Sequence, residues 1–154
     1  MVSKSRDVKH LPYYFLSVAI LQALIGMALG IFMGISGDYT LAPAHANNNL
    51  LGWVSMAIFG LYYAVAGEVA ARRLAAVHFW LALAANLVFP LGIGLVVSGK
   101  GEILSIVGSL LEVLSMLLFG FITWWTVVTA GGTTIEPSYS NTPNATISGP
   151  PAFK

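Results

Sequence analysis

The chain has 154 residues and a formal net charge of +1, and 57% of its residues are hydrophobic while only 8% are charged. Soluble domains carry about 25% charged residues, so this composition excludes an ordinary soluble globular protein. The small net charge gives no reason to expect a nucleic-acid partner. The sequence has no cysteine, which excludes disulfides and thiolate metal sites.

Four apolar segments are long enough to cross a membrane as helices, since about 20 residues span a hydrocarbon core of ~30 Å. They are Leu11 to Ile35, His45 to Gly67, Leu74 to Val97 and Ile103 to Ala130. The connections between them are short, so neighbouring helices are expected to be antiparallel. We therefore expect an all-α membrane protein, with a four-helix up-and-down bundle over residues 1–130. Residues 131–154 are rich in Thr, Ser, Pro, Asn and Gly and form a polar tail that cannot fold alone.

Basic residues determine the predicted orientation, because loops on the cytoplasmic side carry an excess of Lys and Arg. Three basic side chains precede the first span, and Arg72 and Arg73 separate the second span from the third. On the opposite side, Lys100 is the only basic residue in the connections between spans. We expect both ends of the chain at the cytoplasmic face of a bacterial inner membrane.

The first span carries a glycine at every fourth position, at Gly26, Gly30 and Gly34. Small residues with this spacing lie on one face of a helix and let another membrane helix approach closely. Two interpretations of this face stay open. It packs against the other helices of this chain, or it contacts another subunit.

The second span begins with a histidine that is a candidate metal ligand. His45, Asn49, Gly52 and Met56 recur at helical spacing and therefore share one face. A flat macrocycle could lie against this face, with the imidazole on its metal and Gly52 leaving room for the ring. The second ligand stays open: a soft side chain such as Met33 near the outer end of the first span, His45 of another chain, water, or none. The alternative is that His45 and the asparagines after it only cap and solvate the helix end.

His78 lies near the cytoplasmic start of the third span, where it is expected to reach interfacial water or the start of a neighbouring helix, and a structural role is the favoured interpretation. Asn86 lies two turns further along roughly the same face and can hydrogen-bond to a neighbouring helix. A helix of about twenty residues is ~30 Å long at 1.5 Å per residue. His45 and His78 therefore lie near opposite faces of the membrane and cannot share one metal ion.

Glu112 places a carboxyl group near the middle of the fourth span, where an ionisable side chain is costly. Ser105, Ser109 and Ser115 share its face, at steps of three and four residues along the helix. Two interpretations of this polar stripe stay open. It makes hydrogen bonds between helices, or it forms one wall of a proton or water path.

Two of the spans resemble subunit I of the heme-copper oxidase superfamily. The segment HANNNLLGWVSMAIFGLYYAVAGE resembles its second helix, most closely in the nitric-oxide-reductase-like and cbb3-like branches. The segment LAAVHFWLALAANLVFPLGIGLVVSG resembles its His/Gln-Phe-Trp helix. The resemblance implies that His45 is an axial ligand of a low-spin heme and that His78 matches the aromatic helix. It also implies one four-helix repeat of a twelve-helix subunit, and hence a homotrimer that recreates the twelve helices.

The sequence lacks the histidine cluster of a copper site, so an oxidase activity of this chain alone is not expected. The leading hypothesis is a b-type heme protein for electron transfer, sensing or a larger membrane complex, with heme b near the outer face at His45. The second hypothesis is a cofactor-free accessory or scaffold subunit, held by its glycine face and tail. The third is a proton-linked channel or transporter that uses the stripe around Glu112.

Overall fold

The computed structural model describes residues 10–67 and 72–130, and all the regular secondary structure within them is helical. Four helices in this part of the chain are long and apolar enough to cross a membrane. Their length and composition support the predicted multi-pass membrane protein. Three segments lie outside the described residues. They contain the N-terminal basic residues, most of the second connection and the polar tail, and they are 1–9, 68–71 and 131–154.

The helices follow the apolar segments of the sequence closely. They are α2 (Leu11–Ser36), α3 (Ala42–Asn47), η1 (Asn48–Ser55), α4 (Met56–Ala66), α5 (Arg72–Val97) and α6 (Ile103–Ala130). The second span consists of α3, η1 and α4 in one continuous run, and η1 is a π-helix, whose hydrogen bonds join residues five apart. This span begins three residues before the expected His45, because Pro43 fits the first helical turn, where its missing N–H breaks no hydrogen bond.

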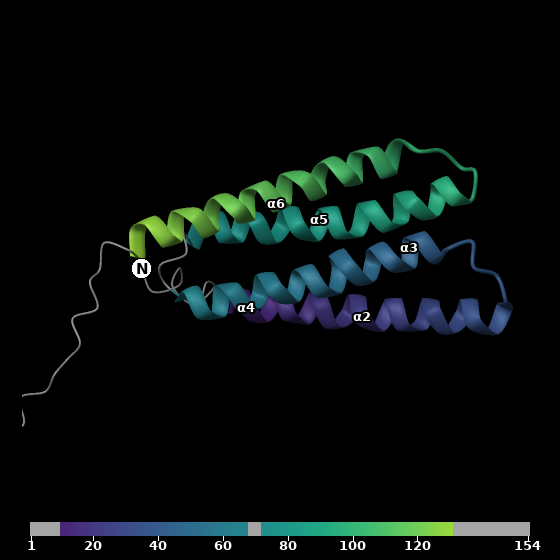
Figure 1. Ribbon diagram of the computed structural model, residues 1–154, viewed down its shortest axis with the longest axis horizontal. Coiled ribbons are helices and arrows are strands. Elements are labelled where there is room, and N and C mark those ends of the chain that lie inside the picture. The colour runs from purple at the N-terminus through teal and green to yellow at the C-terminus, as the bar shows by residue number, and fades with distance from the viewer. Residues whose placement is uncertain (1–9, 68–71, 131–154) are drawn as a thin grey trace, which may run out of the picture.

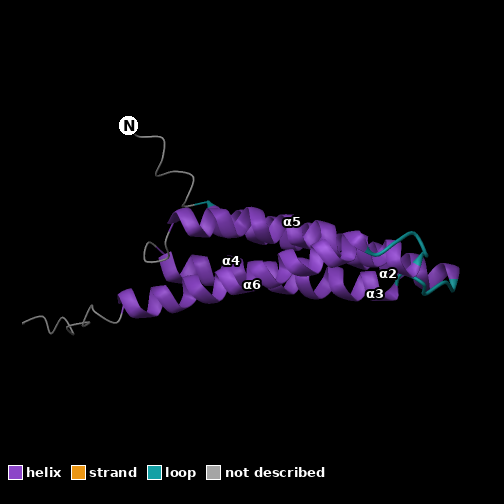
Figure 2. Ribbon diagram, turned by 90° about the horizontal axis from the view of Figure 1, so that it is seen from above, coloured by secondary structure: helices purple, strands orange, loops and turns teal. Residues whose placement is uncertain are grey.

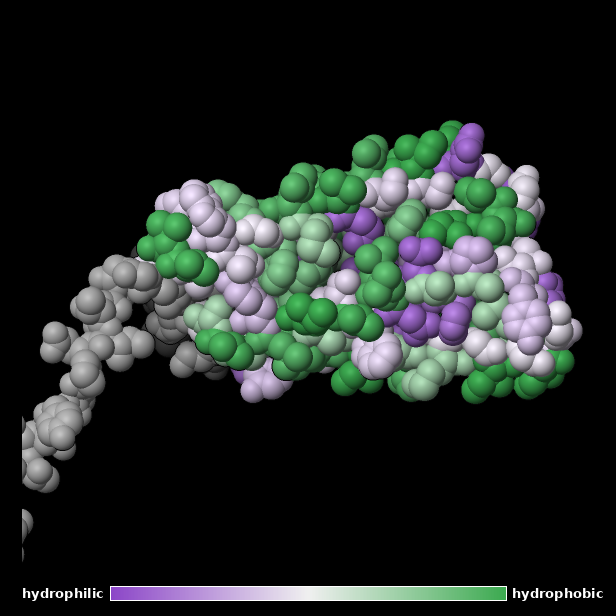
Figure 3. All heavy atoms as spheres, viewed as in Figure 1, coloured by the Kyte–Doolittle hydropathy of each residue, from purple (hydrophilic) through white to green (hydrophobic). Residues whose placement is uncertain are grey.

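Successive spans run antiparallel and form two hairpins, α2 with α3–η1–α4 and α5 with α6 (Figures 1 and 2). We call the end where α4 finishes and α5 begins the terminal end. The opposite end, with the loops at 37–41 and 98–102, is the loop end. Figure 3 shows apolar side chains over much of the visible face, with hydrophilic side chains gathered in the half nearer the loop end. Such an exterior suits contact with lipid.

Aromatic rings from all four spans join the two hairpins near the terminal end. The ring centroids of Phe15 in α2 and Phe79 in α5 are 5.0 Å apart, and those of Phe59 in α4 and Phe119 in α6 are 4.6 Å apart. Phe15 and Phe59 are buried. Pairs at these distances stabilise the contact beyond the burial of their area.

The loop between α2 and α3 is held by its own polar groups. The α2 helix ends at Gly37, which adopts the left-handed conformation (φ 67°) and donates its N–H to the Met33 carbonyl at 2.9 Å. Asp38 Oδ1 accepts hydrogen bonds from the hydroxyl and the backbone N–H of Thr40, at 2.6 and 2.9 Å. These two bonds, the hydroxyl first, lower the pKa of the Asp38 carboxyl because they favour its charged form.

The hairpin of α5 and α6 depends on two glycines. A Cβ atom at Gly92 would overlap the backbone nitrogen of Ser105, and one at Gly108 would lie 2.5 Å from Phe89 Cα. Each contact is between one backbone and another, so no flexible side chain can move aside. Glycine at these positions is what lets the two helices lie so close.

We expect Gly92→Ala to lower the free energy of unfolding by about 1–3 kcal/mol, the usual cost of overpacking a tight interface. The added methyl group must separate α5 from α6. Gly120→Ala is the matched control, since a Cβ there would meet no described atom within 4 Å outside its own helix. Unfolding in detergent micelles, followed by circular dichroism, measures both. Equal stability of the two variants would contradict the close contact.

Candidate functional site

The face of the second span that carries His45 packs against the glycine face of α2. A Cβ at Gly30 would lie 3.1 Å from His45 Cε1, and one at Gly26 would lie 2.7 Å from Asn49 Cγ. These two glycines therefore serve packing within the chain, the first of the two interpretations of the glycine repeat. Gly34 differs, because a Cβ there would meet no described atom within 4 Å.

The space expected for a macrocycle on this face is filled by α2. Gly52 faces the side chain of Gln22, whose Cγ lies 3.0 Å from the position of a Cβ at Gly52. Met56 is fully buried. Heme b lying along His45, Asn49 and Gly52 therefore does not fit within a single chain folded in this way. Gly52 does leave space on this face, but the side chain of Gln22 fills it.

The imidazole of His45 is nevertheless available as a ligand. It is half-buried near the loop end, and Asn49 Nδ2 lies 3.4 Å from its Nδ1 and 3.3 Å from its Nε2. One amide nitrogen cannot be in line with both ring nitrogens, because their hydrogen-bonding directions diverge. At least one of them is therefore free of a linear hydrogen bond from Asn49. Met33, one of the candidates for the second ligand, is buried on α2 one turn beyond Gly30.

Among the described residues, no group of three or more His, Cys, Asp or Glu side chains could hold a metal ion. A metal bound at His45 would therefore need ligands of another kind, such as a macrocycle, a thioether or a residue of another chain.

His78 lies in the aromatic cluster and not at the membrane interface. It is 0% exposed, its ring stacks on Phe119 with centroids 5.5 Å apart, and its Nδ1 lies 2.9 Å from the Tyr63 hydroxyl. Of the two expected contacts, His78 therefore makes the one to a neighbouring helix and not the one to interfacial water, because rings from the other spans close over it. It also lies far along the bundle from His45, near the terminal end.

Three buried amide side chains form a layer between the two histidines, which we call the amide layer. Gln22 of α2, Asn48 of η1 and Asn86 of α5 are only 3%, 7% and 1% exposed. Asn48 Nδ2 donates to the backbone carbonyl of Gln22 at 2.9 Å, and Gln22 Nε2 donates to the backbone carbonyl of Asn86 at 3.4 Å. The layer therefore joins three helices. Asn86 does bridge helices, but through its backbone carbonyl, since its side-chain Nδ2 donates to Ala82 of its own helix at 2.8 Å.

Pro90 explains why the backbone carbonyl of Asn86 accepts a hydrogen bond from another helix. In a regular helix this carbonyl would accept from the N–H of residue 90, and proline has none. A carbonyl without a donor costs several kcal/mol in a bilayer interior, where no water can replace it. Gln22 supplies the missing donor. The signal was present in the sequence, as a proline four residues after Asn86 and a glutamine within an apolar span.

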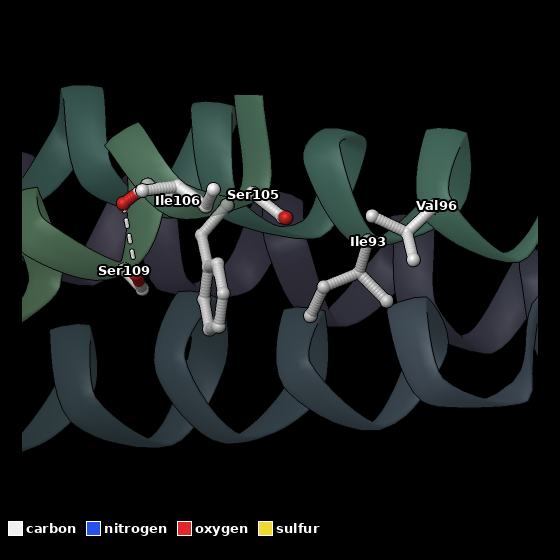
Figure 4. A pocket seen from close by; sticks show the side chains of 6 residues that line it. Ile93, Val96, Ser105, Ile106 and Ser109 are labelled. Atoms are coloured by element: carbon white, nitrogen blue, oxygen red, sulfur yellow. Dashed lines mark hydrogen bonds between the residues drawn. The ribbon is translucent and has the colours of Figure 1, made fainter. Parts of the chain in front are cut away.

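The serine stripe of α6 bonds mainly to its own helix. The hydroxyls of Ser105 and Ser109 donate to the carbonyls of Glu102 and Ile106, at 2.7 and 2.8 Å. These two serines therefore make no hydrogen bond to another described helix. They border a hollow of 260 Å³ between α5 and α6, whose other lining residues are Phe89, Ile93, Val96 and Ile106. Figure 4 shows the two serines beside Ile93, Val96 and Ile106.

Several polar atoms in the interior have no partner. The buried side-chain atoms without a hydrogen bond among the described residues are Tyr62 Oη, His78 Nε2, Asn86 Oδ1, Glu112 Oε1 and Ser115 Oγ. Such groups are rare in native proteins and each calls for an ordered water, a ligand or another chain. Two of them, on Glu112 and Ser115, belong to the predicted polar stripe of α6.

Comparison of the chain with known protein families, with curated proteins and with solved structures gives no match. The likeness to subunit I of the heme-copper oxidases therefore stays a prediction that rests on the motifs of the second and third spans. The function is argued below from the geometry of the described residues.

We expect Gln22→Leu to lower the free energy of unfolding by about 1–3 kcal/mol, the cost of a buried polar group left without its partner. The variant removes the donor to the Asn86 carbonyl. Pro90→Ala restores an N–H within α5, so the double variant should recover most of the loss. Denaturation in micelles of the wild type, both single variants and the double variant gives the coupling. Additive effects would show that Gln22 does not compensate for Pro90.

Proposed function

We propose that the chain is a subunit of a homo-oligomer in a bacterial inner membrane, with copies meeting at α6. The observation that carries the proposal is the carboxyl group of Glu112, which has no hydrogen bond among the described residues although its Oε1 is enclosed, while the residue as a whole is only half-buried and can be reached from outside. A carboxyl group within a span is costly unless another group pairs with it. Copies in the same orientation bring their polar stripes to one depth, where the accessible part of the Glu112 carboxyl group of one copy can bond to Ser109 or Glu112 of the next.

The exposure of α6 supports the same contact. In its most apolar window 11% of the residues are buried, against 22% to 28% in the other three spans. Lipid satisfies the apolar side chains of such a helix, but it offers no comparable partner to Glu112. The resemblance to a twelve-helix subunit favours three copies, and Arg72 and Arg73 favour a cytoplasmic terminal end. In this role the chain is a structural membrane subunit that needs no cofactor to fold.

We expect the wild type to be oligomeric in mild detergent and Glu112→Leu to dissociate at a concentration at least about tenfold higher, equivalent to about 1.4 kcal/mol. Glu112→Gln keeps hydrogen-bonding groups and should retain most of the association. Light scattering after gel filtration, together with crosslinking in native membranes, measures the assembly.

Leu61→Ala is the control, since this side chain is exposed on α4 and should leave the assembly unchanged. A wild type that is monomeric in both detergent and membranes would refute the proposal. So would a Glu112→Leu variant that associates as tightly as the wild type.

A second candidate is a b-type heme protein with His45 as an axial ligand. The half-buried imidazole, with at least one ring nitrogen free of a linear bond from Asn49, is the observation that favours it. When bound, heme supplies one-electron redox chemistry whose potential depends on its axial ligands and surroundings. Because α2 fills the face between His45 and Met56, we assign the group no position within a single chain.

If heme b is bound, the purified protein should show a Soret band, with sharp α and β bands after reduction by dithionite. His45→Ala should remove these bands without changing the far-ultraviolet circular dichroism, since the half-buried ring lies beside Gly30 and Asn49 and is not part of the buried hydrophobic core. His10→Ala is the matched control, as this histidine is exposed at the start of α2. A colourless wild type from heme-replete cells would eliminate this candidate and leave the structural subunit.

A further inference from the structure

The hollow of 260 Å³ between α5 and α6 lies on the loop-end side of Glu112. Ser105 and Ser109 line it from α6 (Figure 4), and Glu112 follows Ser109 by three residues. At 3.6 residues per turn these three side chains lie within about 60° of one another around the helix. Glu112 therefore continues the serine wall of the hollow toward the middle of the span.

The open part of the Glu112 carboxyl group is on the side of the hollow. Gly108 and Ser115, which flank Glu112 on one side of α6, are buried, whereas Ser109 and Met116, which flank it on the other, are half-buried and exposed. Oε1 is enclosed and unpaired. Oε2 also makes no hydrogen bond among the described residues, but it is not among the enclosed atoms. A ligand beside Ser109 can therefore contact this carboxyl group.

The chain offers Glu112 no counter-charge among its described lysine and arginine side chains. Glu112 lies nine residues inside α6, which is ~14 Å from the start of the helix. Lys100 lies in the loop before α6, and Arg73 lies at the terminal end of α5. Since a carboxyl group within a span is costly unless it is paired, a basic ligand would supply what the chain does not.

The rest of the hollow suits a small apolar body. Its other lining residues are apolar, and two of them, Val96 and Ile106, are exposed on the outside of the bundle, so the hollow is open to lipid. The volume is roughly nine times the ~30 Å³ that a water molecule occupies in the liquid. It accommodates about nine non-hydrogen atoms, and a helix of another protein, ~10–12 Å across with its side chains, does not fit in it.

We propose that Glu112 and this hollow bind a small hydrophobic primary amine that enters from the bilayer. When the neutral amine meets the protonated carboxyl group, the carboxyl O–H bond breaks and an N–H bond forms, so the resulting ion pair has no net charge. The ammonium group donates to the Glu112 carboxylate and to Ser109 Oγ, which gives its own hydrogen to the Ile106 carbonyl and keeps lone pairs to accept with. The apolar body lies against Phe89 and Ile93.

One chain supplies every group of this site, so the binding does not rest on the proposed oligomer. The same carboxyl group is used in the contact between copies, however. A bound amine and a second copy therefore compete for Glu112.

Infrared difference spectroscopy in buffered lipid nanodiscs tests the proposal. The probe is cyclooctylamine, an amine of about the size of the hollow, and the matched probe is cyclooctanol, which has the same ring but takes up no proton. We expect saturating cyclooctylamine to remove the C=O stretch of a protonated carboxyl group in the wild type and to produce carboxylate bands. Cyclooctanol should leave the group protonated.

Two variants separate the carboxyl group from the space. Glu112→Gln should abolish the spectral change and weaken amine binding at least about tenfold, the effect of a hydrogen bond to a charged group. Glu102→Gln is its matched control at the exposed start of α6. Ser105→Leu fills the hollow and should weaken binding about fourfold for each CH₂ group of the ligand that loses its contact. Ser98→Leu, at an exposed serine that also bonds to its own helix, should have no effect.

An unchanged C=O band in the wild type, or the same change in Glu112→Gln, would overturn the proposal. So would a Ser105→Leu variant that binds the amine as tightly as the wild type, because the body would then lie outside the hollow. An oligomeric wild type that binds no amine would refute this site and leave the assembly, whereas a monomeric wild type that binds it would do the reverse. The comparison of the two probes in the wild type and in Ser105→Leu keeps the test valid even where Glu112→Gln fails to fold.

Discussion

One missing N–H group organises the middle of this bundle. Pro90 deprives the Asn86 backbone carbonyl of its helical donor, and the hydrocarbon interior of a bilayer offers no water to replace it. The donor comes from Gln22, and the stem of this side chain lies against Gly52. Asn48 then ties the π-helix to the backbone of Gln22. The carbonyl that Pro90 leaves without a helical donor thus lies in the layer where a glycine and three amides meet across three helices.

The spans could be predicted from the sequence because bilayer thickness fixes their length, and α6 begins and ends where its apolar segment does. The face shared by His45, Asn49 and Gly52 also follows from helical spacing. What covers that face could not be predicted. The glycine repeat of α2 and the polar face of the second span are two sides of one contact, but they lie about twenty residues apart, and no local pattern pairs them.

The polar interior was predicted less well, because attention goes first to ionisable groups, whose burial costs most. His78 and Glu112 stand out by that criterion, whereas Gln22 and Asn48 do not, although both join helices. The burial of His78 could not be read from its neighbours in sequence, since Phe119 and Tyr63 come from other spans. A search for carbonyls that prolines leave unpaired would have directed attention to Asn86 and its donor.

The π-helix between Asn48 and Ser55 has an evolutionary consequence. It accommodates one residue more than an α-helix over about the same rise, so losing one residue there would restore α-helix and leave both ends of the span helical. The part that carries His45 would then keep nearly its present orientation relative to α4, because a π-turn takes up its extra residue within about the same rotation as an α-turn. A single codon deletion within η1 could thus leave both the glycine contact at the loop end and the aromatic cluster at the terminal end packed. Only the side chains within η1 itself would face new neighbours.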